Sequence, residues 1–134
     1  MTDLIRTLSL SASGMEAQSR RLRHVSENIA NADTPGYRRK MVPFREAVTH
    51  GAAQGAARGA VAAGPVRLDP RHLPRIFDPA HPMADGTGHY DGSNVDLVVE
   101  IADAREAQRS YEAYLRMFDQ ARQMSQSLLD LLRK

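Results

Sequence analysis

Apolar side chains recur every seven residues along the N-terminal segment, residues 3–31, which contains no proline. The positions on this row are Leu8, Met15, Leu22 and Ile29, and a neighbouring row carries Leu4 and Val25. Because a seven-residue spacing returns to one face of an α-helix, the pattern predicts a single amphipathic helix. Ser11 and Gln18 interrupt the second row, so this helix needs a partner helix to be stable. The Pro-Gly pair at positions 35 and 36 predicts that the helix ends near Asn31.

A second and longer helical pattern occupies about residues 94–134, a segment without proline or glycine. Its apolar positions at helical spacing are Leu97, Ile101, Ala104, Tyr111, Leu115, Phe118, Leu129 and Leu132. Ser93 or Asn94 can cap this helix, and Asp96 and Glu100 fall in its first turns, where the helix dipole favours negative charge. A helix of this length rises about 60 Å, which is typical of a coiled coil or a larger assembly.

The segment between the two helices, residues 46–93, holds most of the glycines and five of the seven prolines. Its first part, residues 46–65, is rich in alanine and glycine and predicts a flexible loop, because it buries too little apolar surface to offset chain entropy. Turn signals are so frequent in residues 66–93 that only a small β element fits there. Short strands are expected at residues 37–42 and at Arg75–Phe77.

The predicted fold class is therefore mainly α. The N- and C-terminal helices pair as a coiled-coil-like helical hairpin and form one discontinuous core domain, residues 1–45 and 94–134. An irregular and partly disordered insert, residues 46–93, interrupts this domain.

Composition excludes several classes of protein. The 134 residues include no cysteine, so a thiolate nucleophile and a sulfur-based zinc site are ruled out. The formal net charge of +2 comes from interleaved signs, which argues against a nucleic-acid binder. The N-terminal segment lacks the continuous apolar run of a cleaved signal peptide, and no stretch approaches the ~18 apolar residues that span a bilayer.

Candidate catalytic and metal-binding groups do not form a recognisable constellation. Three histidines and three aspartates share the loop-rich stretch, namely His72, His81, His89, Asp78, Asp85 and Asp91, but their spacings match no defined metal site. His24 and His50 lack an obvious nucleophile or carboxylate partner. The basic cluster Arg38, Arg39 and Lys40 is interpreted as a solvated turn or an ion-pairing surface rather than a phosphate site. We expect no enzyme activity, no cofactor, no metal and no small-molecule substrate.

The run Ser-Glu-Asn-Ile-Ala-Asn-Ala-Asp-Thr-Pro-Gly-Tyr, residues 26–37, resembles the signature near the N terminus of bacterial flagellar rod and hook proteins. The motif positions are Asn28, Ala30, Asn31, Thr34, Gly36 and Tyr37. In physical terms, the two asparagines can bond backbone groups at the helix end, and Thr-Pro-Gly makes the exit turn.

Three further stretches are similar to proximal-rod members of this family: residues 77–85, residues 106–113, and the start of the last helix at Asn94, Val95 and Asp96. Two features depart from that pattern. Ser93 stands where proline is usual, and the short run of residues 33–37 is closer to the FlgB type.

The resemblance implies a non-catalytic structural subunit of the proximal rod in the periplasmic basal body. Many copies would stack helically through their terminal helices and transmit torque for motility. Expected assembly positions are Leu8, Met15, Leu22, Val25, Ile29, Ile101, Tyr111, Leu115, Phe118 and Leu129.

Export through the flagellar type III apparatus without a cleaved signal is also implied. The partners implied are further copies of the chain, FlgB-like and FlgF-like subunits, a FliE-like adaptor and the membrane ring. Two alternatives stay open: a FlgB-type rod subunit, and a helical adaptor that never polymerises. The stoichiometry of its complexes separates the adaptor from a rod subunit.

Overall fold

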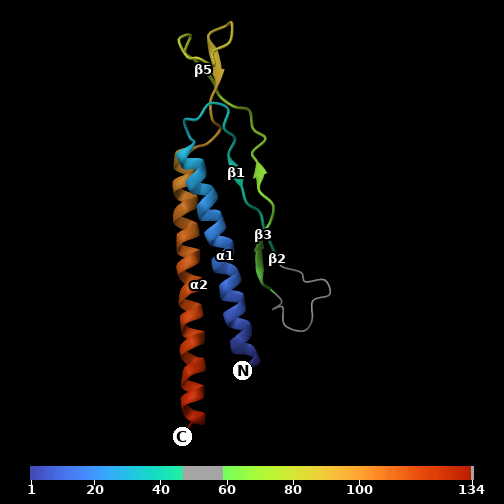
Figure 1. The fold of residues 1–134 in the computed structure, drawn as a ribbon, viewed down its shortest axis with the longest axis vertical. Helices are drawn as coiled ribbons and strands as arrows, with labels where there is room; N and C mark the ends of the chain where they lie inside the picture. Colours follow the sequence, from blue (N-terminus) through green and yellow to red (C-terminus); the bar gives the residue numbers. More distant parts are fainter. Residues whose placement is uncertain (47–58, 134) are drawn as a thin grey trace.

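Two long antiparallel helices dominate the computed structural model, which describes residues 1–46 and 59–133 (Figure 1). Helix α1 spans Thr2–Ala30 and helix α2 spans Leu97–Leu132. They pack along each other, and the segment between them carries short β-strands. The predicted mainly α hairpin of terminal helices is therefore confirmed.

Helix α1 ends where its polar residues predict. The side chain of Asn31 donates to the carbonyl of Glu27 at 2.9 Å, and the Thr34 hydroxyl donates to Asn31 Oδ1 at 3.1 Å. Gly36 then adopts a φ of 75°, in the left-handed region that glycine tolerates best. These contacts satisfy the helix end and turn the chain away from the helix axis.

Helix α2 begins later than expected. Asp96 is its N-cap: one carboxylate oxygen accepts from the amides of Val98 at 2.9 Å and Val99 at 3.4 Å. The expected start near residue 94, with Ser93 or Asn94 as the cap, is wrong. Asn94 cannot cap because its side-chain oxygen accepts from the backbone amide of Arg39 at 2.7 Å. The 36 residues of α2 rise about 54 Å.

Small and polar side chains, rather than the predicted leucine row, make up most of the buried positions of the two helices. The buried residues of α1 are Ser11, Gly14, Ala17, Gln18, Val25 and Asn28, and those of α2 are Glu100, Ala107 and Ala121. Ser11 and Gln18, which interrupt the second row, thus lie inside. Leu8, Met15 and Leu22 are only half-buried.

The apolar core of the described chain is correspondingly small. Its buried hydrophobic residues are Ala17, Val25, Ala107 and Ala121. Larger apolar side chains remain exposed along both helices, Leu115 and Leu129 of α2 among them. The hairpin therefore buries little of the apolar surface that its sequence supplies.

The described segments between the helices form three antiparallel pairs of short strands. Strand β1 (Lys40–Met41) pairs with β4 (Arg67–Leu68), β2 (Phe44–Glu46) with β3 (Val61–Ala63), and β5 (Arg75–Phe77) with β6 (His89–Asp91). The registers place Lys40 opposite Leu68, Phe44 opposite Ala63, and Ile76 opposite Tyr90.

The strands match the sequence predictions in part. The strand Arg75–Phe77 is confirmed, whereas the strand expected over residues 37–42 is reduced to β1. Within the loop expected over residues 46–65, Val61–Ala63 is strand β3, which packs against α1. Residues 47–58 of that loop lie outside the described residues. The division into core domain and insert stays a prediction.

We call residues 37–46 and 59–73 the arm, and residues 74–92 the tip. The arm runs beside α1, and the tip, with β5 and β6, projects beyond the helix pair at the end opposite both termini (Figure 1). Neither α1 nor α2 combines the length and hydropathy that crossing a bilayer requires.

Candidate functional site

Asn28 lies at the centre of a polar junction where α1, α2 and the arm meet. Its side chain is fully buried. Oδ1 accepts from the Tyr37 hydroxyl at 3.0 Å and from the Lys40 amide at 2.9 Å. Nδ2 donates to the Lys40 carbonyl at 2.9 Å and to Glu100 Oε2 at 3.2 Å. Asn28 therefore uses both donors and both acceptor positions of its amide to join three elements.

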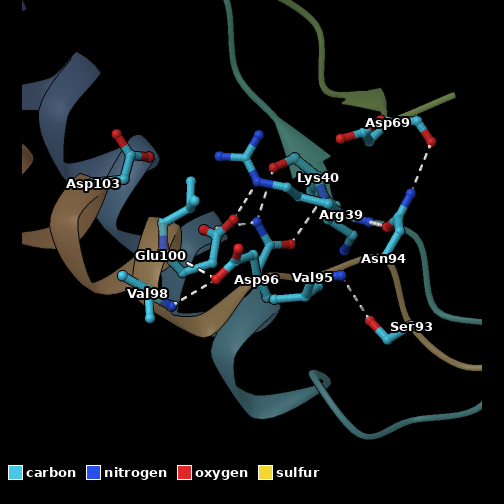
Figure 2. A network of polar contacts seen from close by, with 12 residues as sticks. Arg39, Lys40, Asp69, Ser93, Asn94, Val95, Asp96, Val98, Glu100 and Asp103 are labelled. Atoms are coloured by element: carbon cyan, nitrogen blue, oxygen red, sulfur yellow. Dashed lines mark hydrogen bonds and ion pairs between the residues drawn. The ribbon is translucent and has the colours of Figure 1, made fainter. Parts of the chain in front are cut away.

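Glu100 supplies the contribution of α2 to this junction. Its side chain is fully buried and forms an ion pair with Arg39 Nε, in addition to the bond from Asn28 (Figure 2). A buried carboxylate without partners is strongly destabilising, so Arg39 and Asn28 together make the burial tolerable. The pair ties the start of α2 to the arm.

Asn94 completes the junction on the side of the arm. Its side-chain Nδ2 donates to the carbonyls of Asp69 and Arg71, each at 3.3 Å. Its Oδ1 accepts a hydrogen bond from the backbone amide of Arg39 (Figure 2). Arg38 donates to the same two carbonyls at 3.1 and 2.9 Å. Asn94 thus links the two segments of the arm, residues 37–46 and 59–73, to the start of α2. The amide of Val95 donates to the Ser93 hydroxyl at 3.2 Å, which shapes the approach to the Asp96 cap.

An ion pair marks the outer edge of the junction. Lys40 Nζ lies 2.7 Å from Glu27 Oε2. The hydrogen bond from Lys40 holds the pKa of Glu27 below its usual value, and the same bond raises the pKa of Lys40. Burial raises the pKa of the Tyr37 hydroxyl, so this group stays protonated and can donate to Asn28.

The motif residues fall into two groups. Asn28 and Tyr37 build the junction itself, and Asn31, Thr34 and Gly36 shape the turn after α1. Ala30, the last residue of α1, is exposed. The amide of Gly36 also donates to the carbonyl of Asp91 at 3.0 Å, so this turn touches the base of the tip.

The expected assembly positions are divided between the inside and the outside of the hairpin. Val25 is buried, and Tyr111 and Phe118 are half-buried in α2. The exposed positions are Ile29, Ile101, Leu115 and Leu129, which present 37%, 47%, 40% and 48% of their surface to solvent. The first group is thus at least partly covered by the rest of the chain, and the second group is exposed.

A cavity of about 320 Å³ lies beside the junction and is lined by Arg21, His24, Arg39, Lys40, Phe44 and other residues. Its cations already have carboxylate partners: Arg21 pairs with Asp103, Arg39 with Glu100, and Lys40 with Glu27. These carboxylates neutralise the three cations that line the cavity, so the cavity does not attract an anion. An ion-pairing surface describes Arg39 and Lys40, whereas Arg38 donates to the backbone carbonyls of Asp69 and Arg71.

The aspartates and histidines of the tip serve its turns. Asp85 accepts from the amide of Thr87 at 2.9 Å, from its hydroxyl at 2.6 Å and from the amide of His89 at 3.2 Å. His81 stacks on Tyr90 with ring centroids 3.9 Å apart. Among the residues that the structure describes, no three histidine or acidic side chains are grouped as metal ligands.

The sequence did not predict the buried ion pair of Glu100 with Arg39. It predicted only that Glu100 interacts with the helix dipole. The sequence signals for the two residues are weak. Glu100 lies next to the apolar positions of α2, and Arg39 belongs to a basic cluster just after the asparagine motif. Gly14 was also missed, although a glycine inside a helical pattern often indicates a close approach.

Comparison with known proteins identifies the class. Residues 8–38 match the family model for flagella basal body rod protein, and residues 87–131 match the model for flagellar basal body rod FlgEFG protein C-terminal. The matched segments contain the Asn28 motif and most of α2, which are two of the three parts that meet at the junction. The chain is a structural protein of the flagellar basal-body rod class, and it is not an enzyme.

Individual relatives narrow the class to one family. The chain is 41% identical to flagellar basal-body rod protein FlgC of Agrobacterium fabrum over 140 residues, covering 99% of this chain and 98% of the relative. It is 32% identical to FlgC of Escherichia coli O6:H1, with 96% and 97% covered, and 36% identical to FlgC of Aquifex aeolicus, with 88% and 89% covered.

The chain belongs to the FlgC family of flagellar basal-body rod proteins. The proximal-rod resemblance seen in the sequence is thereby confirmed as the FlgC type rather than the FlgB type. As a subunit of the rod, the protein assembles with other rod subunits.

Proposed function

We propose that this chain polymerises helically in the proximal rod through its two terminal helices and transmits torque as part of the drive shaft. One observation carries this proposal: the helices expose large apolar side chains while the buried apolar core consists of Ala17, Val25, Ala107 and Ala121. A hairpin that buries so little surface is stabilised further when neighbours cover its exposed faces.

A polar defect inside the hairpin supports the same proposal. Gln18 Oε1 is buried and has no hydrogen-bond partner among the residues that the structure describes. An unpaired buried acceptor costs about 1–3 kcal/mol, a large share of what a small core supplies. The terminal helices of the free subunit therefore fray and gain order when neighbouring subunits bury them.

The assembly face lies on the side of the hairpin that the arm leaves open. Strand β3 lines a hollow with Ser13, Ala17 and Arg20, so it covers that side of α1. The seven-residue row of Leu8, Met15, Leu22 and Ile29 lies on another side of α1. Together with Ile101, Leu115 and Leu129 of α2, this row forms the surface that meets neighbours.

The neighbours that we propose are further copies of the chain, FlgB-like and FlgF-like subunits, a FliE-like adaptor and the membrane ring. The subunit reaches the periplasmic rod through the flagellar type III export apparatus, with its N-terminal segment retained. The family resemblance supports these partners.

Incorporation of a Leu115→Asp variant into rods tests the assembly face. Leu115 is 40% exposed, so the charge is tolerated in the free subunit but disrupts a buried contact between subunits. The matched control is Gln123→Asp, which adds the same side chain to the same helix at another exposed position. We expect Leu115→Asp to be made but absent from isolated basal bodies, and Gln123→Asp to be incorporated. Normal motility with Leu115→Asp would contradict the assembly face.

The second candidate function, a helical adaptor that does not polymerise, predicts a different stoichiometry. Quantitative mass spectrometry of isolated basal bodies measures the copies of this chain per rod. Several copies per turn of a helical layer support the polymer, and one copy per partner molecule supports the adaptor.

A further inference from the structure

The tip presents an exposed aromatic ring, that of Phe77 in β5, which is 66% accessible to solvent. Contacts inside the tip nevertheless hold this ring in place. The ring of His89 lies beside it with centroids 5.0 Å apart, and a Cβ atom built on Gly88 would lie 3.0 Å from its Cε2. An aromatic side chain held in this way loses little entropy when it enters a pocket of another protein.

The loop beyond β5 and β6 also has a fixed shape. Asp85 accepts three hydrogen bonds from Thr87 and His89. The amide of Asp78 donates to the carbonyl of Gly88 at 2.9 Å, which extends the pairing of the two strands into the loop. Because these contacts are local, the tip of the free subunit is preorganised for binding.

The pairing of β5 with β6 places polar side chains around Phe77. Directly opposed residues of two paired strands point to the same face, and residues two apart along a strand share that face. Phe77 is opposite His89, and Arg75 is opposite Asp91, so all four lie on one face of the tip. Arg75 forms ion pairs with Asp91 and with Asp85. An aromatic side chain surrounded by a polar rim is the arrangement of an interaction hot spot.

The tip is acidic. Residues 74–92 contain one arginine, Arg75, and three aspartates, Asp78, Asp85 and Asp91, so their net charge is −2 with the histidines neutral. The arginine is already paired with two of the aspartates, which leaves the excess charge of the tip negative. A complementary partner surface therefore has a pocket for a phenyl ring and lysine or arginine side chains at the rim of that pocket.

Two cavities of this chain lack that chemistry. An apolar cavity of about 250 Å³ lies between α1 and α2, and Leu4 and Met117 are among its lining residues. Asp3 is the one charged side chain among its described lining residues, and it would repel the acidic tip. In the cavity beside the junction, carboxylates of the chain already neutralise the cations. The chemistry therefore favours a rod subunit of a different sequence over a second copy of this chain.

The place of the tip in the fold makes such a contact accessible. The tip projects beyond the helix pair at the end opposite both termini (Figure 1). It is thus separate from the helix faces to which the function proposed above assigns assembly. A subunit that receives the tip lies beyond this end of the hairpin.

We propose that the tip docks on a rod subunit of a different sequence, with Phe77 in an apolar pocket and the aspartates of the tip beside lysine or arginine side chains of that subunit. This inference rests on the proposed function, because incorporation into the rod supplies the neighbour. It adds a second contact to those of the helix faces and states the chemistry of its partner surface.

Photocrosslinking in assembled rods tests the docking. The full chain is produced with p-benzoylphenylalanine in place of Phe77, basal bodies are isolated and irradiated, and linked peptides are identified by mass spectrometry. We expect a link to a rod subunit of a different sequence, at a peptide with apolar residues beside lysine or arginine. The matched control places the same amino acid at Ile76, which is 40% exposed on the opposite face of the same strand. Its links should be several-fold weaker.

Three outcomes would overturn the docking and leave incorporation through the helices intact. They are rods that contain the substituted chain but give no link, a link from position 77 to a further copy of this chain or to a protein outside the rod, and equal links from positions 76 and 77. Absence of the unaltered chain from isolated basal bodies would instead overturn the proposed function itself.

Alanine substitutions separate docking from the stability of the tip. Ile76 packs inside the tip, because a Cβ atom built on Gly92 would lie 2.7 Å from its Cδ1, whereas Phe77 is the more exposed of the two. At equal production, Phe77→Ala should lower the amount of chain in isolated basal bodies several-fold, and Ile76→Ala should lower it less. An equal or larger loss with Ile76→Ala would show that only the fold of the tip matters, and would overturn the docking.

Discussion

The aromatic ring of Tyr114 in α2 lies directly against the backbone of Gly14 in α1. A Cβ atom built on Gly14 would lie 2.6 Å from Cδ1 of that ring, well inside van der Waals contact. Gly14 is buried in the middle of a helix, where glycine is otherwise unfavourable by about 0.5–1 kcal/mol relative to alanine. Close approach of the helices is therefore the reason for this glycine.

Gly14→Ala is expected to destabilise the hairpin despite the higher helix propensity of alanine. Overpacking costs about 1–3 kcal/mol, which exceeds the propensity gain. Thermal unfolding followed by circular dichroism measures the effect. Combined with Tyr114→Ala, the same substitution should become neutral or stabilising, because the ring is gone. Loss of stability of equal size in both backgrounds would show that the ring is not the cause.

Truncation of Glu100 should cost far more than truncation of a neighbouring surface glutamate. Glu100→Ala leaves Arg39 without its buried partner and removes an acceptor from Asn28, and breaking a buried pair costs about 3–5 kcal/mol. Glu106→Ala is the control, since its side chain is 72% exposed and such pairs contribute about 0–1 kcal/mol. Urea unfolding of both variants checks the difference. Similar midpoints would contradict the junction as the main tie between α1, α2 and the arm.

Substitution of Gly36 and of Gly86 by alanine isolates the effect of backbone strain, because neither position is crowded. A Cβ atom would meet nothing within 4 Å at either position, but only Gly36 has a left-handed φ, of 75°. Gly36→Ala should therefore cost about 1–2 kcal/mol, the penalty of that conformation for an L-residue, and Gly86→Ala close to none. Unfolding midpoints give the comparison. A neutral Gly36→Ala would mean that the turn after α1 relaxes freely.

Acid should loosen the tip through Asp85. Hydrogen bonds from Thr87, and then from Arg75, hold the pKa of this carboxyl below its usual value of 3.8. A lowered native pKa means that the ionised carboxylate stabilises the fold above that usual value, and that this contribution is lost as the pH falls toward the native pKa. In a carboxyl NMR titration, the midpoint of Asp85 should fall below its usual value of 3.8, and Arg75→Gln should move that midpoint upward. Titration at the usual value would contradict the hydrogen-bonded tip.

Local signals in the sequence predict the helices well. The seven-residue apolar spacing and the motif around Asn31 locate α1, and the absence of proline and glycine after residue 93 locates α2. The cap of α2 is harder to assign, because Ser93, Asn94 and Asp96 are all capable residues. A tertiary contact from Arg39 occupies Asn94 and leaves the cap to Asp96.

The junction could not be derived from one sequence because its partners are far apart in the chain. Arg39 and Glu100 are separated by 61 positions, and neither stands out as a buried group. The side of α1 that faces α2 could not be derived for the same reason. Apolar content favours the row of Leu8 and Leu22, but Gly14 beneath Tyr114 and Asn28 beside Glu100 turn a polar row toward α2.

Hydrogen–deuterium exchange of the helix ends, in the free subunit and in isolated basal bodies, tests most directly the claim that assembly orders this protein. The free chain should exchange fast at residues 2–10 and 122–132, which include no buried residue, and more slowly around Asn28 and Glu100. In basal bodies the same helix ends should become protected. Equally slow exchange of both ends in the free monomer would contradict assembly-coupled ordering.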